Sequence, residues 1–117
     1  MVVNVKQKYQ VIYYTANNQS PVQKFINSLD HRQKAKIRRT LQQIKNFGLI
    51  TIKNKTKKLA GTPLWELKIV GKDNIRLLYF YLKNNNLCIL HGFIKKKQKT
   101  PLKEIKIAIN HYQKLTN

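Results

Sequence analysis

The segment from 64 to 69, with the sequence LWELKI, places one carboxylate and one cation among apolar side chains. Successive side chains of an extended strand point to opposite faces, so Glu66 and Lys68 would share a face, roughly 7 Å apart. Arg76 begins the next apolar run, and a hairpin through residues 71–74 would bring it opposite Lys68. The spacing therefore predicts a carboxylate and two cations on one face of a sheet.

Further candidates follow on the same face. His91 ends the third apolar run, and the lysine-rich connector after it could fold back over the same edge. One carboxylate, one imidazole and several cations suit cleavage of RNA, which carries its own nucleophile, the 2′-OH. Glu66, or Lys68 as a neutral amine, could take the 2′-OH proton, and Arg76 suits a bidentate hold on the phosphate. Lys95 or Lys96 could stabilise charge, and His91 could be the acid. The catalytic candidates are Glu66, Lys68, Arg76, His91, Lys95 and Lys96.

Each candidate also has a purely structural interpretation. Glu66 could be only a counter-charge, His91 a structural histidine at a strand end, and Trp65 a core residue. Tyr79 and Tyr81 alternate with apolar residues as in sheet packing, although an exposed tyrosine could stack on an RNA base. On spacing alone, the pattern indicates a basic nucleic-acid-binding domain, with nuclease activity as one alternative.

The charge balance narrows the choice of partner. The 117 residues contain 24 Lys+Arg and 4 Asp+Glu, a formal net charge of +20. This charge favours a polyanion: nucleic acid first, anionic lipid second and an acidic protein third. Codon bias could explain the excess of lysine over arginine, but it does not explain the shortage of acids. The expected RNA-binding lysines of the two basic connectors are Lys53, Lys55, Lys57, Lys58, Lys97 and Lys99.

Metal and cofactor chemistry are not expected. His31, His91 and His111 are far apart, and the four glycines are isolated, so neither a metal motif nor a phosphate-binding loop is present. The single cysteine, Cys88, rules out an internal disulfide and fits a reducing compartment, which predicts a cytoplasmic protein. No apolar run is long enough to span a membrane, so no membrane partner is expected.

The elements that position these groups begin with a strand and two helices. The β-branched and aromatic run at 9–15 predicts a strand. Ser20, Pro21 and Gln23 have the types and spacing of a helix start with a capping box. A longer helix is predicted from Asp30 to Gly48, because its apolar residues recur at helical spacing and glycine is typical just after a helix.

The second half of the sequence predicts an antiparallel meander of three strands, followed by a last helix. Three strand-like runs, at 64–70, 75–83 and 87–93, are separated by turn residues, and the basic segment 50–58 before them predicts a loop. Thr100-Pro101 predicts the N-cap and first position of the last helix. The sequence therefore predicts one α+β domain over residues 1–117, with a small, mostly antiparallel sheet packed with helices.

Several of these motifs, in this order, also resemble a known family. The runs LWELK at 64–68, IRLLY at 75–79 and HGFIKKKQKTP at 91–101, followed by Glu104-Ile105, resemble the HigB-like, phage-derived branch of the RelE/ParE toxin superfamily. The likeness extends upstream to SPV at 20–22 and KLAG at 58–61. The resemblance implies a RelE-like βααβββα fold.

The resemblance also implies a function and partners. It implies the cytoplasmic toxin of a type II toxin–antitoxin system, a ribosome-dependent endoribonuclease that cleaves messenger RNA by 2′-OH attack. A cognate antitoxin of the helix-turn-helix type would be encoded by an adjacent gene. Because fold does not fix function, a ParE-like inhibitor of DNA gyrase without nuclease activity is the alternative.

Residue roles follow from the same resemblance. Lys68 and Arg76 correspond by position to sheet residues proposed to act on the 2′-OH and the phosphate, and Lys95 and Lys96 to the basic pair after the last strand. The sequence departs from RelE at Glu66, where RelE has a basic residue, and it has no match for the C-terminal tyrosine of RelE. The identity of the general base therefore stays open.

Overall fold

The computed structural model describes residues 9–83 and 86–116, in which five strands form one sheet. The elements in chain order are β1 (Gln10–Tyr13), α1 (Pro21–Asn27), α2 (His31–Phe47), the 3₁₀ helix η1 (Leu49–Lys55), β2 (Thr56–Lys58), β3 (Trp65–Lys68), β4 (Ile75–Leu82), β5 (Asn86–Ile94) and α3 (Leu102–Thr116). The strand order is β1-β5-β4-β3-β2, and only the β1–β5 pair is parallel. The predicted α+β fold, with a mostly antiparallel sheet packed with helices, is confirmed.

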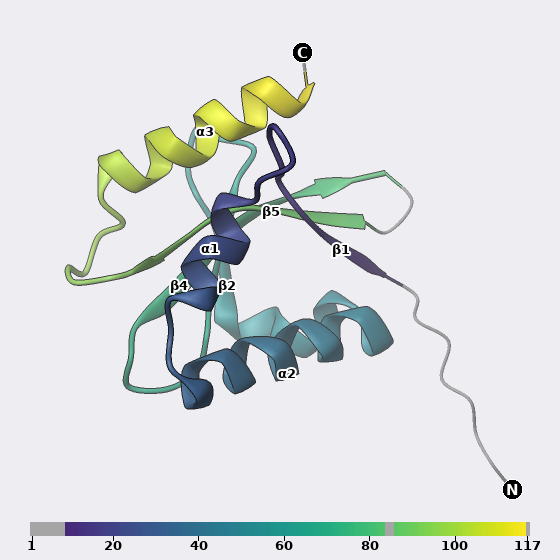
Figure 1. Cartoon of the computed structure of the whole chain (residues 1–117), viewed down its shortest axis with the longest axis vertical. Helices are drawn as coiled ribbons and strands as arrows, with labels where there is room; N and C mark the ends of the chain where they lie inside the picture. The colour runs from purple at the N-terminus through teal and green to yellow at the C-terminus, as the bar shows by residue number, and fades with distance from the viewer. Residues whose placement is uncertain (1–8, 84–85, 117) are drawn as a thin grey trace, which may run out of the picture.

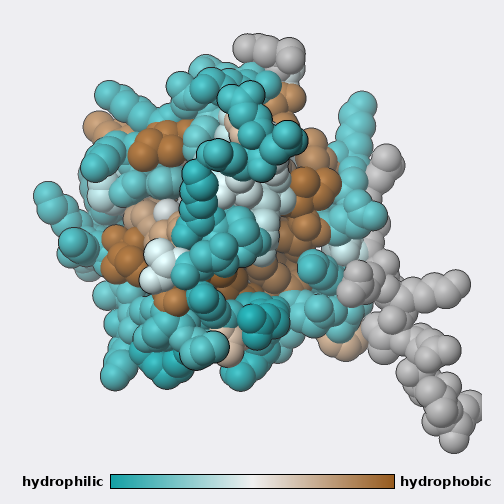
Figure 2. Space-filling model, viewed as in Figure 1, coloured by the Kyte–Doolittle hydropathy of each residue, from teal (hydrophilic) through white to brown (hydrophobic). Residues whose placement is uncertain are grey.

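The sheet lies between α2 on one side and α3 on the other (Figure 1). On the α2 side, residues of α1 and α2 such as Ile26 and Leu41 pack with Leu77 of β4 in one apolar core. On the α3 side, Leu78 of β4 and Ala108 of α3 belong to a second core. Burial of these apolar surfaces is the main stabilising term of the fold. Hydrophilic side chains cover most of the outer surface seen in Figure 2, with apolar patches between them.

Alternation along β3 follows the predicted pattern. Leu67 belongs to the α2-side core and Trp65 packs against it, whereas Glu66 faces the α3 side. Gly92 of β5 also serves the α2-side core, because a Cβ there would stand 2.5 Å from the ring of Phe25 in α1. The glycine thus permits a close approach between α1 and the sheet.

The basic segment 50–58 is not the predicted loop. It contains most of η1 and the whole of β2, and β2 pairs antiparallel with β3 at the edge of the sheet. Ile52 anchors η1 in the α2-side core with no exposed surface. The lysines obscured this structure because a short edge strand with one solvated side needs no apolar alternation.

Helix starts differ in detail from the prediction. Ser20 caps α1 by accepting a hydrogen bond from the backbone N–H of Gln23. The Gln23 side chain donates to Asn27 instead of returning to Ser20, so only one of the two capping-box hydrogen bonds forms. Asp30 forms the complete capping box of α2, which ends at Gly48 as predicted. α3 begins at Leu102, one residue after the predicted first position at Pro101.

Candidate active site

Neighbouring strands bring the predicted groups to one part of the α3-facing side of the sheet. Lys68 and Arg76 are cross-strand partners in β3 and β4, as the sequence predicts. On the other flank, Lys57 of β2 stands opposite Glu66. The backbone N–H of Lys95, just after β5, donates to the carbonyl of Asn74 at 2.8 Å. Residues from four segments thus line a pocket of about 220 Å³: Asn54, Lys55, Thr56, Lys57, Glu66, Lys68, Arg76 and Lys95. We call this the cation pocket.

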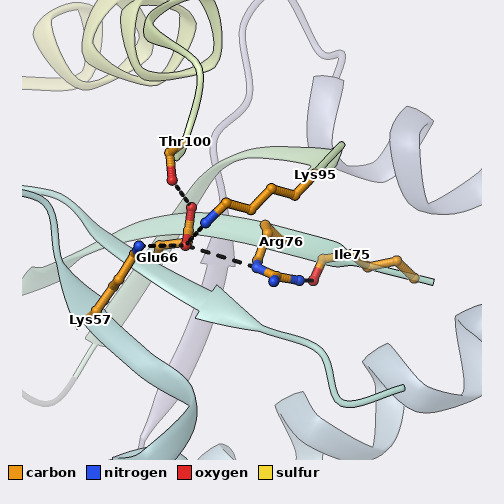
Figure 3. Close-up of polar contacts among 6 residues, drawn as sticks. All are labelled: Lys57, Glu66, Ile75, Arg76, Lys95 and Thr100. Carbon is orange, nitrogen blue, oxygen red and sulfur yellow. Dashed lines mark hydrogen bonds and ion pairs between the residues drawn. The ribbon is translucent and has the colours of Figure 1, made fainter. Parts of the chain in front are cut away.

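Glu66 is the centre of this pocket (Figure 3). Its side chain is only 4% exposed, and its Oε2 lies 3.1 Å from the Lys95 Nζ. The Lys57 Nζ is 3.6 Å and the Arg76 Nε 3.9 Å from the same oxygen. The hydroxyl of Thr100 donates to the other carboxylate oxygen, Oε1. Both oxygens of Glu66 are therefore engaged by the protein itself.

The surroundings of Glu66 favour its ionised form. Burial opposes ionisation, but hydrogen bonds from Thr100 and Lys95, with the charges of Lys95 and Lys57, lower the pKa of Glu66 below its ordinary value. Three cationic groups within 4 Å of one carboxylate leave two positive charges uncompensated. The pocket is therefore suited to an anion.

Arg76 is a largely buried cation with two contacts to the protein. Its side chain is 12% exposed, and its guanidinium lies between the Glu66 carboxylate and the Ile75 carbonyl, to which Nη1 donates at 3.3 Å (Figure 3). A guanidinium offers five N–H donors in a fixed plane, so donors remain for a phosphate oxygen. Lys68, by contrast, is exposed.

His91 lies outside the cation pocket. Its Nε2 is 2.9 Å from Oε1 of Glu104 in α3, and its ring stacks on Phe93 with 5.7 Å between centroids. Burial lowers the pKa of His91, although Glu104 opposes this shift. Burial therefore favours the neutral form of the ring, which can bind the Glu104 carboxylate through an Nε2–H. The structure does not bring His91 together with the other predicted catalytic groups.

Of the other predicted lysines, two line the cation pocket, whereas Lys96, Lys97 and Lys99 are not among its lining residues. Lys55 and Lys57 line it, and Lys53 and Lys58 are exposed on either side of them in the chain. Three exposed lysines follow Lys95 on the connector to α3: Lys96, Lys97 and Lys99.

Thr100 is a functional candidate that the sequence analysis missed. A threonine before a proline predicts a helix cap, but this hydroxyl binds Glu66, which is 34 positions away. No local pattern reports such a contact. The one feature of the sequence that hints at a partner for Thr100 is Glu66, a carboxylate in a chain that is mostly basic.

Within residues 9–83 and 86–116, no group of three or more His, Cys, Asp or Glu side chains could hold a metal ion. No helix in that part of the chain is both long and apolar enough to cross a membrane.

Comparisons with known proteins place the chain in a family. A chain of the archaeal RelE–RelB complex from Pyrococcus horikoshii OT3 is 18% identical, with a TM-score of 0.58, and the match covers 77% of this chain and 98% of that one. A chain of the RelBE2 toxin–antitoxin complex from Mycobacterium tuberculosis is 15% identical, with a TM-score of 0.49 and coverage of 75% and 99%. No curated protein matches the sequence. Residues 24–113 match the family described as "Phage derived protein Gp49-like (DUF891)", so the chain belongs to the Gp49-like family of phage-derived proteins.

Proposed function

We propose that this chain is the toxin of a type II toxin–antitoxin system and cleaves messenger RNA on the ribosome. The observation that carries the proposal is the convergence of Lys57, Arg76 and Lys95 on one buried carboxylate in an open, positively charged pocket. Membership of the Gp49-like family and the RelE-like fold support the toxin role. A phosphodiester is the anion that such a pocket would hold in RNA.

In the proposed mechanism, the RNA supplies the nucleophile. Arg76 and the lysines of the pocket hold the scissile phosphate, and Lys68, which lines the same pocket, takes the proton of the adjacent 2′-OH. The 2′ oxygen then bonds to phosphorus, and the bond from phosphorus to the 5′ oxygen breaks. The leaving 5′ oxygen takes a proton from a neighbouring ammonium group. The fixed cations stabilise the additional negative charge of the transition state.

Between the two candidate bases, the geometry favours Lys68. The Glu66 oxygens accept from Lys95 and Thr100, and the lowered pKa of Glu66 makes it a weak base. Glu66 is better suited to positioning, because it holds Lys95 and Thr100 against β3. The exposed amine of Lys68 is free to approach RNA.

The partners follow from charge and from the fold. Exposed lysines on both flanks of the pocket would dock ribosomal RNA, and this binding should weaken steeply with added salt. A cognate antitoxin of the helix-turn-helix type, encoded next to this gene, would neutralise the toxin. Its place of action would be the cytoplasm, where ribosomes and messenger RNA are found.

Expression of the wild type and of Arg76→Ala tests the proposal. Wild-type expression should arrest growth and truncate transcripts inside translated regions. Loss of one preorganised donor at a phosphoryl site is expected to slow cleavage by about 10²–10³-fold, so Arg76→Ala should restore growth. Arg32→Ala is the matched control, because Arg32 also pairs with a carboxylate, Asp73, but lies outside the pocket.

Three outcomes would contradict the proposal. If Arg76→Ala still cuts transcripts at the wild-type rate, the assignment of the pocket is wrong. If the wild type inhibits supercoiling by purified gyrase and cuts no transcript, the protein is a ParE-like gyrase inhibitor. If expression of the wild type is harmless and cuts no transcript, the chain is not an active toxin.

A further inference from the structure

A second pocket lies on the opposite face of the same sheet edge. Its volume is about 380 Å³, and its lining includes Ile50, Lys53, Thr56, Trp65, Tyr79 and Tyr81. Trp65 and Glu66 are neighbours in β3 and point to opposite faces, so this aromatic pocket and the cation pocket lie back to back. Thr56 of the edge strand β2 lines both pockets.

The aromatic side chains of this pocket are held in fixed positions. Tyr79 is 1% exposed, and its hydroxyl lies 2.7 Å from the hydroxyl oxygen of Thr56. Its ring meets that of Tyr81 edge to face, with 6.1 Å between centroids and 77° between planes. Trp65 is a cross-strand partner of Tyr79 and packs against the α2-side core. Tyr81, which is 45% exposed, therefore lies at the open side of the pocket with its ring against the buried Tyr79.

The rim of the pocket combines exposed apolar surface with positive charge. Ile50 is 71% exposed and stands in the same pocket as the half-exposed Tyr81. Lys53 is exposed at this rim, and Lys55 and Lys57 lead from it into the cation pocket. An aromatic surface bordered by cations suits a nucleobase and its phosphates, because every base has a π-face and stacking tolerates any sequence.

We propose that the aromatic pocket of Trp65 and Tyr81 binds an unpaired base of the RNA strand whose phosphate occupies the cation pocket. The strand would cross the β2 edge at Thr56, with Lys53 contacting a phosphate on the way. This inference rests on the proposed function. It adds a stacking site on the face of the sheet opposite the scissile phosphate.

Trp65 provides a direct test, because it is the chain's single tryptophan. The probes are a fluorescein-labelled 2′-O-methyl hexanucleotide, in which the nucleophile is blocked, and an abasic oligomer with the same number of phosphates. Binding is followed by anisotropy and by Trp65 fluorescence in low salt. The hexanucleotide should quench Trp65 and bind at least about fivefold more tightly than the abasic oligomer.

Single-residue variants test which side chains of the aromatic pocket bind the base. Tyr81→Ala should lower the affinity for the base-bearing probe to nearly that for the abasic one. Ile50→Ala should reduce it less, and Leu102→Ala is the matched control because Leu102 is also 71% exposed but lies on α3. Circular dichroism and thermal unfolding of each variant show that it is folded.

The outcomes separate this inference from the proposed function. Equal affinity and equal quenching for the two probes would overturn the stacking site, even if the wild type cuts transcripts in cells. Base-dependent quenching of Trp65 without any transcript cleavage in cells would support the stacking site and contradict the proposed nuclease activity. If Tyr81→Ala binds RNA normally but escapes neutralisation by the antitoxin, the pocket belongs to a protein partner and the inference is wrong.

Discussion

Two carboxylates meet the α3-facing side of the sheet in contrasting ways. Glu66, on β3, has three cationic groups within 4 Å of one oxygen and a hydroxyl on the other. Glu104, on α3, is bound to the imidazole of His91, whose pKa is lowered by burial. The first arrangement leaves excess positive charge beside a pocket, and the second leaves none. This difference indicates that the Glu66 cluster is built to receive an additional anion, while the Glu104 contact joins a helix to the sheet.

The largest expected difference between the two regions is in stability. Glu66→Ala leaves the Lys95 ammonium, 7% exposed, without its closest partner, and breaking such a buried pair costs about 3–5 kcal/mol. Glu104→Ala removes one hydrogen bond between a carboxylate and the His91 ring and should cost less, about 1.5–3 kcal/mol. Urea denaturation of both variants measures the difference. Equal losses of unfolding free energy in the two variants would show that the Glu66 cluster is no more important for stability than the Glu104 contact.

Anion binding should depend on the cation pocket and not on Glu104. Because the cation pocket has excess positive charge, inorganic phosphate should raise the melting temperature of the wild type and of Glu104→Ala. Arg76→Ala should lose most of this stabilisation, since the guanidinium supplies the best-placed donors. A phosphate effect that is unchanged in Arg76→Ala would place the anion elsewhere.

Much of the Glu66 region could be predicted from the sequence because strand alternation and the hairpin turn fix the register. These two rules placed Glu66 and Lys68 on one face and Arg76 opposite Lys68, as observed. The path of the chain after β5 follows no periodic rule. For that reason, the sequence placed Lys95 among the candidates at this edge, but it could not predict that Lys95 and Thr100 both bind Glu66.

In the Glu104 region, too, the sequence predicted the element but not its contacts with distant residues. The predicted start of the last helix at Thr100-Pro101 puts Glu104 in its first turn, where the structure has it. The sequence did not indicate that His91 would face this helix, because the packing of a helix on a sheet depends on side chains far apart in the chain. Similarly, β2 was hidden by its lysines, although it forms one wall of the cation pocket.

A smaller effect is expected from Thr100→Val, which keeps the side-chain shape and removes the hydroxyl. Hydrogen bonds to charged groups contribute about 1.5–3 kcal/mol, so the variant should be destabilised by roughly that amount. Thr100→Ser retains the donor and is the matched control. If Val and Ser behave alike in urea denaturation, the hydroxyl does not anchor the connector to Glu66.

The response to acid should also distinguish the regions. Since the pKa of Glu66 is lowered in the folded protein, the unfolded chain takes up this proton first as the pH falls through the ordinary value of 4.5. Stability is therefore lost from about pH 4.5 downward, until the folded form is also protonated. Glu66→Gln should flatten this loss in pH-dependent urea titrations. Asp73, whose pKa is lowered chiefly by the hydrogen bond from Arg32, supplies part of the remaining slope.

The smallest expected effect concerns His91 and has its own pH range. Burial lowers the pKa of His91 in the folded protein, so the unfolded chain binds this proton first as the pH falls below 6.5. The free energy of unfolding should therefore begin to decrease as the pH falls below about 6.5, whereas the loss that depends on Glu66 begins at about pH 4.5. His91→Gln should abolish this slope and leave the acid loss of the Glu66 cluster unchanged. An unchanged slope between pH 6.5 and 5 in His91→Gln would show that the imidazole is not held neutral beneath α3.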